Sequence, residues 1–370
     1  MGQLFKSFFL GGFECSTHRR RDGRRLDLIR STRHDIHAEL DYLSLRAHGI
    51  ETVRDGLRWH LIETSPGHYD WASFLPMLRA ARRAKVQPIW DLCHYGWPDD
   101  LDIWSPQFVE RFAAFAAAVA SLLRAESDET SFFCPVNEIS FWAWAGGDKG
   151  LFNPTAKGRG MELKCQLVRA SLAAAQAIRQ VDPYARLAHV DPVIHIVPKT
   201  PRSRHKAAHA RLAQYEAWDM LEGTLYPELG GNVDLLDIIG VNYYSNNQWM
   251  LHGRTIGRDH ALYRPFRDIL AETYQRYRRP IFVAETGAEG VHRAPWFRYV
   301  CDEVRAAIDN GIPVEGVCLY PITDYHGWTN SRHCKSGLLG RPDAEGRRPV
   351  HQELADELAF QHARFLVEAS

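Results

Sequence analysis

Short apolar segments and amphipathic segments alternate eight times along this chain of 370 residues, and this alternation limits the fold more than any other feature. The apolar segments span residues 8–16, 52–59, 87–94, 131–138, 186–192, 236–244, 280–287 and 314–323. The helical patterns span residues 35–50, 70–86, a stretch from Pro106, 161–181, 205–222, 266–278, 295–310 and 350–366. Apolar strands separated by amphipathic helices indicate a parallel sheet covered by helices, and eight such units close into a barrel. The sequence therefore predicts an α/β fold, a single (β/α)₈ (TIM) barrel domain over residues 1–370.

Charge and hydropathy exclude several classes of protein. The chain has 45 Lys and Arg against 45 Asp and Glu, so bulk charge draws it neither to nucleic acid nor to a membrane surface. It has no apolar run of about 18 residues, and we expect no membrane-spanning helix. The first residues, MGQLFKSFFLGGFECS, indicate a first strand and not a signal peptide, because Lys6 interrupts a short apolar run.

The cysteines indicate neither a disulfide framework nor a metal centre. The seven cysteines are scattered along the chain without a CxxC pair. Reduced thiols of this kind fit a cytoplasmic protein. We expect no metal and no other cofactor, and the sequence leaves the oligomeric state open.

Polar residues end nearly every predicted strand. In this fold the C-terminal ends of the strands meet at one rim, where catalytic groups are found. The residues at these ends are Glu14, Arg54, Asp55, Asp91, His94, Asn137, Glu138, Asp191, Asn242, Tyr243, Tyr244, Glu285 and Asp324. Seven of the eight strands therefore bring a carboxylate to the same rim, without a set of cations that would hold a phosphate.

Tryptophans follow the same strand ends. They are Trp97, Trp142, Trp144, Trp249 and Trp328. A sugar has an apolar face and a rim of hydroxyl groups, and it suits a site that combines indole rings with carboxylates and amides. Each tryptophan taken alone is as well explained by packing in the core or in a loop.

Two carboxylates that flank a glycosidic bond suffice to hydrolyse it, one as a proton donor and the other as a nucleophile. The residues alone do not select the pair from the seven candidates. A metal site is the competing use of such carboxylates, but barrel hydrolases of that kind want a His-x-His on the first strand. Here only His18 lies near that position.

Seven segments, in order along the chain, match the motifs of a known family. They are FFLGGFECS, VRDGLRWHLIETSPGHYDW, PIWDLCHYGWPDDL, CPVNEIS, LLDIIGVNYYS, PIFVAETG and DYHGW. In this order they resemble the strand-end motifs of the (β/α)₈ retaining glycoside hydrolases, most closely those of glycoside hydrolase family 1, the β-glucosidase family. A bare Asn-Glu means little, whereas the ordered set on the predicted strands is specific.

The resemblance implies a role for each matched residue. Glu138 would be the acid and then the base, and Glu285 the nucleophile, with their carboxyl groups about 5–5.5 Å apart, as in retaining enzymes. Arg54 and Tyr244 would hydrogen-bond Glu285. Tyr243, by contrast, would point into the packing. The remaining expected substrate-binding residues are Asn137, which would hold the 2-hydroxyl, and His94, Asn242, Trp328, Asp324, Trp142 and Glu14.

The sequence also departs from the family pattern. Ile139 replaces the proline after the acid, and Thr286 stands before Gly287 where an asparagine is expected. Gly327 replaces the glutamate that grips the outer hydroxyls of glucose, and His18 or Arg19 lies where the first-strand glutamine is expected. The chemistry is kept while the sugar-recognition residues change. Arg19, Arg20 and Arg21 raise the alternative of an anionic sugar, against the simpler reading of a solvated charged run.

The resulting hypothesis is a retaining β-glycosidase that acts on a small carbohydrate or glycoside. Three alternatives stay open: a transglycosylase with the same carboxylates, a carbohydrate-binding pseudoenzyme, and a metal-dependent barrel hydrolase. The sugar, the aglycone and the linkage cannot be derived from the sequence.

Overall fold

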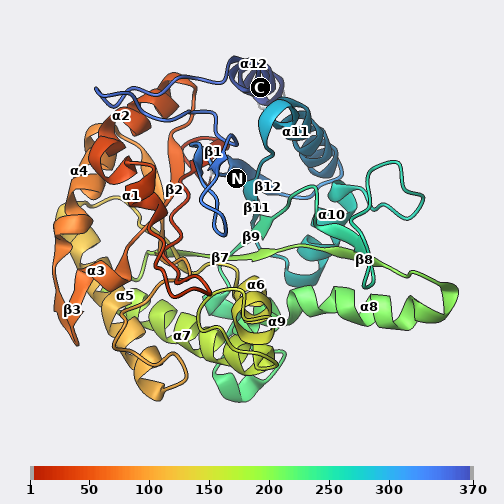
Figure 1. Cartoon of the computed structure of the whole chain (residues 1–370), viewed down its shortest axis with the longest axis horizontal. Coiled ribbons are helices and arrows are strands. Elements are labelled where there is room, and N and C mark those ends of the chain that lie inside the picture. The colour runs from red at the N-terminus through yellow and green to blue at the C-terminus, as the bar shows by residue number, and fades with distance from the viewer. Residues whose placement is uncertain (1–3, 367–370) are drawn as a thin grey trace.

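Eight parallel strands form a closed barrel in the computed structural model, which describes residues 4–366 (Figure 1). The barrel strands are β1 (Phe9–Gly12), β2 (Thr52–Gly56), β5 (Gln87–Cys93), β6 (Phe132–Val136), β7 (Arg186–Pro192), β9 (Ile238–Asn242), β11 (Ile281–Thr286) and β12 (Val314–Leu319). Their order around the barrel is the order of the chain, and parallel pairing of β1 with β12 closes the ring. The predicted (β/α)₈ barrel is therefore confirmed, with each of the eight strands inside its predicted segment.

Helices cover the outside of the barrel (Figure 1). The main ones are α2 (His34–Ala47), α4 (Leu75–Arg83), α5 (Pro106–Glu126), α7 (Gly160–Val181), α9 (Glu216–Glu222), α10 (Phe266–Tyr277), α11 (Arg293–Asp309) and α12 (Gln352–Leu366). The helix predicted over residues 205–222 is instead two helices, α8 (Arg204–Leu212) and α9, with a 3₁₀ turn between them. Helix α8 extends away from the barrel in Figure 1 and packs on β8 (His195–Val197), which pairs with β10 (Gln248–Met250).

Short elements are inserted in the loops at the C-terminal ends of the barrel strands. They are α1 (Leu28–Ser31), α3 (Trp59–Ile62), the hairpin of β3 (Glu63–Ser65) and β4 (His68–Tyr69), α6 (Ile139–Trp142), and the hairpin of β13 (Tyr325–His326) and β14 (His333–Cys334). A π-helical segment, Ala143–Asp148, continues directly from α6. This segment follows the predicted acid Glu138, and π-helical turns are often found at functional sites.

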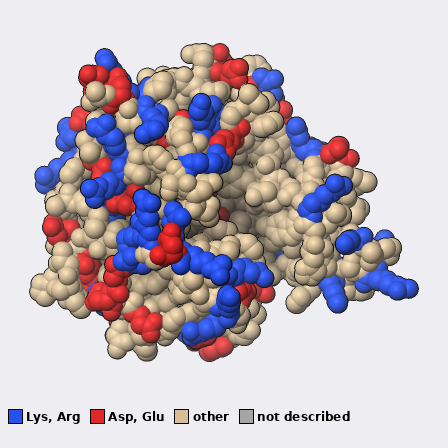
Figure 2. Space-filling view, in the orientation of Figure 1, with Lys and Arg blue, Asp and Glu red and all other residues tan. Residues whose placement is uncertain are grey.

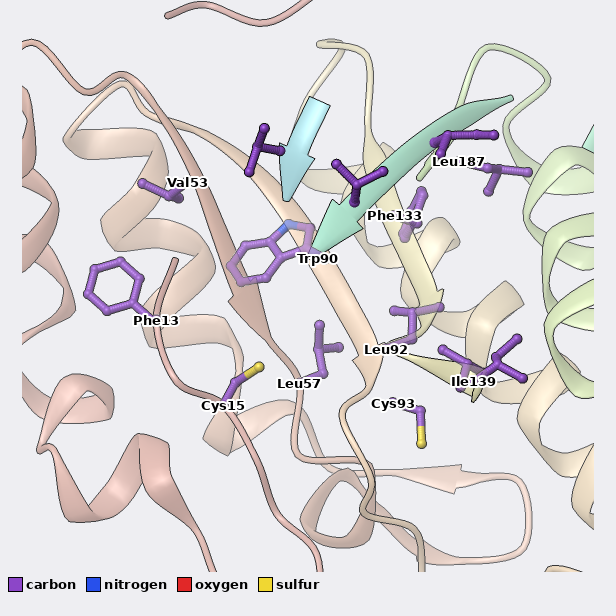
Figure 3. Close-up of a cluster of buried hydrophobic side chains, with 14 of the residues drawn as sticks. Phe13, Cys15, Val53, Leu57, Trp90, Leu92, Cys93, Phe133, Ile139 and Leu187 are labelled. Atoms are coloured by element: carbon purple, nitrogen blue, oxygen red, sulfur yellow. The ribbon is translucent and has the colours of Figure 1, made fainter. Parts of the chain in front are cut away.

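The side chains of the strands alternate between two apolar layers. On β5, Trp90 and Leu92 point outward into the large core between strands and helices, part of which Figure 3 shows. Ile89 points inward, where it packs with a smaller cluster that includes Leu10 and Phe132. Since this cluster fills the barrel, polar side chains of the strand ends form a layer above it.

Glycine is required where β1 meets the end of β12. A Cβ atom on Gly12 would lie 2.1 Å from the ring of Tyr320, so only glycine lets this ring enter the top of the barrel. There the ring lies parallel to His94, with centroids 6.2 Å apart.

Two sequence expectations concern the chain as a whole. Within residues 4–366, no helix is both long enough and apolar enough to cross a bilayer. All seven cysteines lie in this part of the chain and are free thiols, which confirms that they form no disulfide framework.

Candidate active site

Glu285 owes its direction to an irregularity in β11. Phe282 and Ala284 point into the barrel interior, so regular alternation would turn the next side chain outward. The register shifts between Val283 and Glu285 against β9, and again between Val283 and Thr286 against β12. Such bulges re-aim a side chain. Here Glu285 faces the barrel axis, where it is buried.

Arg54 from β2 is the cation beneath Glu285. Its side chain has no solvent exposure. Nη1 donates to Glu285 Oε1 at 3.1 Å and to the Ala284 carbonyl oxygen at 2.9 Å. Nη2 donates to Asp91 Oδ2 at 2.7 Å and to Asn137 Oδ1 at 3.0 Å. The expected bond to Glu285 is present. Arg54 also forms an ion pair with Asp91, which is the contact that a purely structural role of Arg54 would need.

The second oxygen of Glu285 is held by the tyrosine that follows β9. Tyr244 Oη donates to Glu285 Oε2 at 2.9 Å, as expected from the sequence. Tyr243 points to the other side and stacks on Phe266 with ring centroids 4.0 Å apart, which confirms its predicted packing role. The carboxyl group of Glu285 thus has a guanidinium donor on one oxygen and a phenol donor on the other.

Glu138, at the end of β6, has no such cation. Its backbone lies in the left-handed region, with φ of 48°, a strained conformation that non-glycine residues adopt mainly at functional sites. Its carboxyl group accepts hydrogen bonds from Tyr95 Oη at 2.5 Å and Asn242 Nδ2 at 2.8 Å. Burial raises the pKa of Glu138 well above its usual range, and the nearby charge of Glu285 raises it further. Glu138 is therefore the group that keeps a proton near neutral pH.

Asn137 links the group around Glu285 to the group around Glu138, because it contacts both Arg54 and Tyr95. Its amide nitrogen donates to Tyr95 Oη at 3.0 Å and to His94 Nε2 at 3.2 Å. Since Nε2 accepts there, the proton of the neutral ring lies on Nδ1, which donates to Asp91 Oδ2 at 3.0 Å. Burial lowers the pKa of His94, but Asp91, Glu14 and Glu285 outweigh it and raise this pKa.

Glu14 adds a fourth acidic side chain to the site, after Glu285, Asp91 and Glu138. It is 5% exposed, and its Oε1 accepts hydrogen bonds from the backbone nitrogen of Ser16 at 3.1 Å and from the Ser16 hydroxyl. Within the described residues, its Oε2 has no hydrogen-bond donor. Burial raises the pKa of Glu14, while the positive form of His94 lowers it and Glu285 raises it.

Aromatic rings form one wall beside Glu138. Trp328 is half-buried, and its ring centroid lies 4.7 Å from that of His18 and 5.7 Å from that of Tyr95. Phe141 and Phe152 complete the group at 6.2 and 6.0 Å from Trp328. Burial lowers the pKa of His18 to about 3, so this ring is neutral near pH 7. The wall is apolar and uncharged, as the face of a sugar requires.

Three of the seven rim carboxylates are held by groups of the protein itself. Asp55 points outward and accepts hydrogen bonds from His34 Nε2 at 2.8 Å and from Tyr42 Oη. Asp191 accepts from the backbone nitrogen of Ser140 and thereby holds the start of α6. Asp324, expected to bind substrate, accepts from the backbone nitrogen of Gly337 and lies 3.3 Å from His333 Nε2.

The five tryptophans also divide into those that pack within the protein and those that lie at the mouth of the barrel. Trp142, expected to bind substrate, is completely buried behind Tyr95, and its Nε1 donates to the Asn153 carbonyl oxygen. Trp97 packs against Trp142, and Trp249 packs with the small cluster beneath α8. Of the five tryptophans, Trp328 and the exposed Trp144 are the two that lie at the mouth of the barrel. The position of a residue at a strand end fixes where its side chain begins but does not fix the direction in which the side chain points.

The arginines of the β1 loop are mostly bound to protein groups. Arg19 and Arg25 share the carboxylate of Asp99. Arg20 donates to the Thr329 carbonyl oxygen and to Ser331 Oγ at 3.3 Å. These bonds hold the loop against the segments after β5 and β12, and they leave Arg21 as the exposed member of the expected cluster.

Cys15, Asp91 and His94 have ligand atoms within 4.8 Å of one another, close enough to share a metal ion. The same Asp91 oxygen already accepts from Arg54, which would repel a cation. Burial raises the pKa of the Cys15 thiol well above its usual value, and the charge of Asp91 raises it further. Since a metal needs the thiolate, these residues do not fit a metal centre.

The structure also brings in residues that the sequence reasoning did not assign. Tyr95, with φ of 69°, bonds both Glu138 and Asn137, and Asp91 orients both Arg54 and His94. Tyr95 directly follows His94 in the chain, and that position was the available signal. Phe141 and Phe152 lie in loops whose path no strand pattern predicts.

Comparison with solved structures agrees with the barrel fold. A β-glucosidase from Thermotoga maritima in complex with noeuromycin superposes with a TM-score of 0.78 at 14% identity, covering 98% of each chain. An enzyme named AHE from Alicyclobacillus herbarius gives 0.80 at 18% identity, covering 97% of this chain and 99% of that one. The chain has the fold of a β-glucosidase. No protein-family model and no curated protein matches the sequence, so the likeness establishes the fold alone.

We expect Arg54→Leu to lower the free energy of unfolding by about 3–5 kcal/mol, because it leaves two buried carboxylates without their cation. Urea unfolding near neutral pH measures this change. Adding Glu285→Gln to Arg54→Leu should recover part of the loss, since one of the stranded charges is removed. The matched control is Arg83→Leu, which breaks an exposed pair with Glu39 and should change the free energy of unfolding little, because water screens this pair. A loss for Arg54→Leu as small as that of the control would contradict the prediction.

Proposed function

We propose that this protein is a retaining β-glycosidase with Glu285 as nucleophile and Glu138 as acid and base. The observation that carries the proposal is the contrast between the two carboxyl groups. Glu285 forms an ion pair with Arg54, whereas burial and the charge of Glu285 keep the proton on Glu138. Double displacement needs this difference between one ionised and one protonated carboxyl group.

The reaction follows from these positions. A Glu285 oxygen attacks the anomeric carbon while the bond to the aglycone oxygen breaks, and Glu138 gives that oxygen its proton. The ionised Glu138 then takes a proton from water, which attacks the same carbon and releases Glu285. Bonds from Tyr95 and Asn242 orient Glu138 for both proton transfers. A sugar acceptor in place of water would give transglycosylation, and product analysis with added alcohols distinguishes the two.

We infer that the sugar lies between the aromatic wall and the polar floor. Trp328 offers an apolar face, and Asn137 and His94 offer amide and imidazole groups beside Glu285. Glu14 supplies a free carboxyl oxygen that can accept from a sugar hydroxyl. The segment around Gly327 has no acidic side chain to do this, so Glu14 takes the place of the outer-hydroxyl contacts of the β-glucosidase family.

Substitutions of the two carboxyl groups separate their roles. Glu285→Gln should abolish turnover of every glycoside, because no other group forms the glycosyl-enzyme. Glu138→Ala should nearly keep the first step for an activated aryl glycoside and lose it for a substrate with a poor leaving group. Added azide should speed the second step and yield a β-glycosyl azide, detected by NMR. Equal damage to both substrates without azide rescue would show that Glu138 is structural, and would point to Asp91 or Asp324 as the acid.

The pH profile tests which group carries the proton. Activity needs protonated Glu138, so kcat/KM for a poor leaving group should fall as the pH rises through the raised pKa of Glu138. The bond from Tyr95 lowers this pKa, so Tyr95→Phe should move the alkaline limb to higher pH. Tyr243→Phe, on the far side of the same rim, should leave it in place. A limb that stays or moves down in Tyr95→Phe would refute the assignment.

Glu14→Gln tests the recognition of the sugar. A hydrogen bond from a hydroxyl to a carboxylate is worth about 1.5–3 kcal/mol, so kcat/KM for the preferred aryl glycoside should fall about tenfold or more. The ranking among sugars should change as well. Asp324→Asn, whose carboxylate is held by Gly337 and His333, should keep the ranking. An unchanged ranking in Glu14→Gln would exclude Glu14 from the sugar site.

A further inference from the structure

Two loops at the mouth of the barrel are bound to each other next to Glu138. They are residues 17–25, after β1, and residues 143–160, after α6. Asn153 Oδ1 accepts from the backbone nitrogen of Arg19 at 2.7 Å, and the Asn153 nitrogen donates to the Arg19 carbonyl oxygen at 2.9 Å. A β-bridge joins Arg20 to Phe152. We call the surface of these two loops the basic rim.

The basic rim is strongly positive although the whole chain has no net formal charge. Residues 17–25 contain five arginines and one aspartate, and residues 143–160 contain two lysines, one arginine and a single acid, Asp148. Asp99, Asp22 and Glu162 neutralise several of the arginines. Figure 2 shows a hollow in this face of the molecule with Lys and Arg side chains gathered along one side of it.

Four cations of the basic rim are not neutralised by groups of the described part of the protein. Within residues 4–366, the side chains of Arg21, Arg24, Lys149 and Lys157 have no ion-pair or hydrogen-bond partner, and all four residues are exposed. The nearby acid Asp148 accepts from the backbone nitrogen of Gly160 at 2.7 Å. The two lysines flank the π-helical segment: Lys149 N donates to the Trp144 carbonyl oxygen at its end, and the backbone beside Lys157 is bonded to Gly146 and Asp148.

An exposed indole lies in the same segment as the two lysines. Trp144 is 47% exposed, and its ring lies 6.0 Å from Phe141, which in turn lies 6.1 Å from Tyr95. Tyr95 bonds Glu138 directly. A continuous row of rings therefore leads from the proton donor, on the leaving-group side of the scissile bond, to the surface at the basic rim.

We propose that the basic rim binds an anionic group on the aglycone of the substrate, with Trp144 contacting an apolar part of that aglycone. This rests on the glycosidase function proposed above. The anion is a carboxylate, sulfate or phosphate carried by the leaving group and not by the sugar. The floor of the site argues for this, because the carboxyl groups of Glu14, Asp91 and Glu285 face one arginine there and would repel an anionic sugar.

The test compares two aryl glycosides of one sugar, one with a neutral nitrophenyl aglycone and one with a carboxylate added to the ring. Lys149→Glu/Lys157→Glu should lower kcat/KM for the anionic substrate about tenfold at about 20 mM salt, and the loss should shrink at about 0.5 M salt. The neutral substrate should change less than about twofold, since screening acts on charge alone. Trp144→Ala should lower kcat/KM for both. Lys206→Glu, on the distant α8, is the matched control and should change neither.

Direct binding separates this proposal from the glycosidase function. If no glycoside is turned over, calorimetry with the free carboxylated phenol still tests the rim, and the double variant should lose the binding seen with the unaltered protein. The proposal is overturned if the double variant affects both substrates equally, or if it binds the free acid as well as the unaltered protein does. It is also overturned if the lysines matter only for sedimentation with vesicles of anionic lipid, which would make the rim a membrane-facing patch.

Discussion

One buried guanidinium determines the chemistry of this site. Arg54 is shared by Asp91 and Glu285, so three charged groups at the top of the barrel carry one excess negative charge. A further carboxylate beside them is costly, because little water screens it. Burial is the main cause of the raised pKa of Glu138, and the charge of Glu285, which Arg54 holds, raises it further. Any change in the number of carboxylates around Arg54 should alter both members of the proposed catalytic pair.

The barrel supports this arrangement through its backbone more than through its side chains. The irregular register of β11 turns Glu285 inward next to Ala284, whose carbonyl oxygen also accepts from Arg54. The left-handed backbone of Glu138 and the bond from Ser140 to Asp191 fix the start of α6. Strain at these points is tolerated because the apolar clusters inside and outside the strands hold the barrel rigidly.

The sequence predicts the fold and the centre of the site well, and the periphery poorly. Strand periodicity places all eight strands, and the ordered motifs place Arg54, Tyr244, Glu138 and Glu285 where their contacts are found. Asp55 faces outward to His34, as strand alternation next to the inward-facing Arg54 requires, but an inventory of strand ends does not separate the two faces of a strand. Trp142 and Asp324 were assigned by position, but a buried bond to Asn153 and a bond from Gly337 hold them away from the expected contacts. These partners lie in loops, whose path depends on tertiary contacts.

The charges of the molecule are separated by depth. The floor holds acidic groups around one arginine, and the rim holds cations that the folded chain does not neutralise. A charged sugar of either sign would be repelled at one of these depths, whereas a neutral sugar is not repelled at the floor and an anionic aglycone is attracted at the rim. The same separation helps the chemistry, because a leaving group that carries negative charge departs toward the positive rim and away from Glu285. The exposed cations thus act on release of the aglycone as well as on its binding, and both effects weaken together as salt screens the rim.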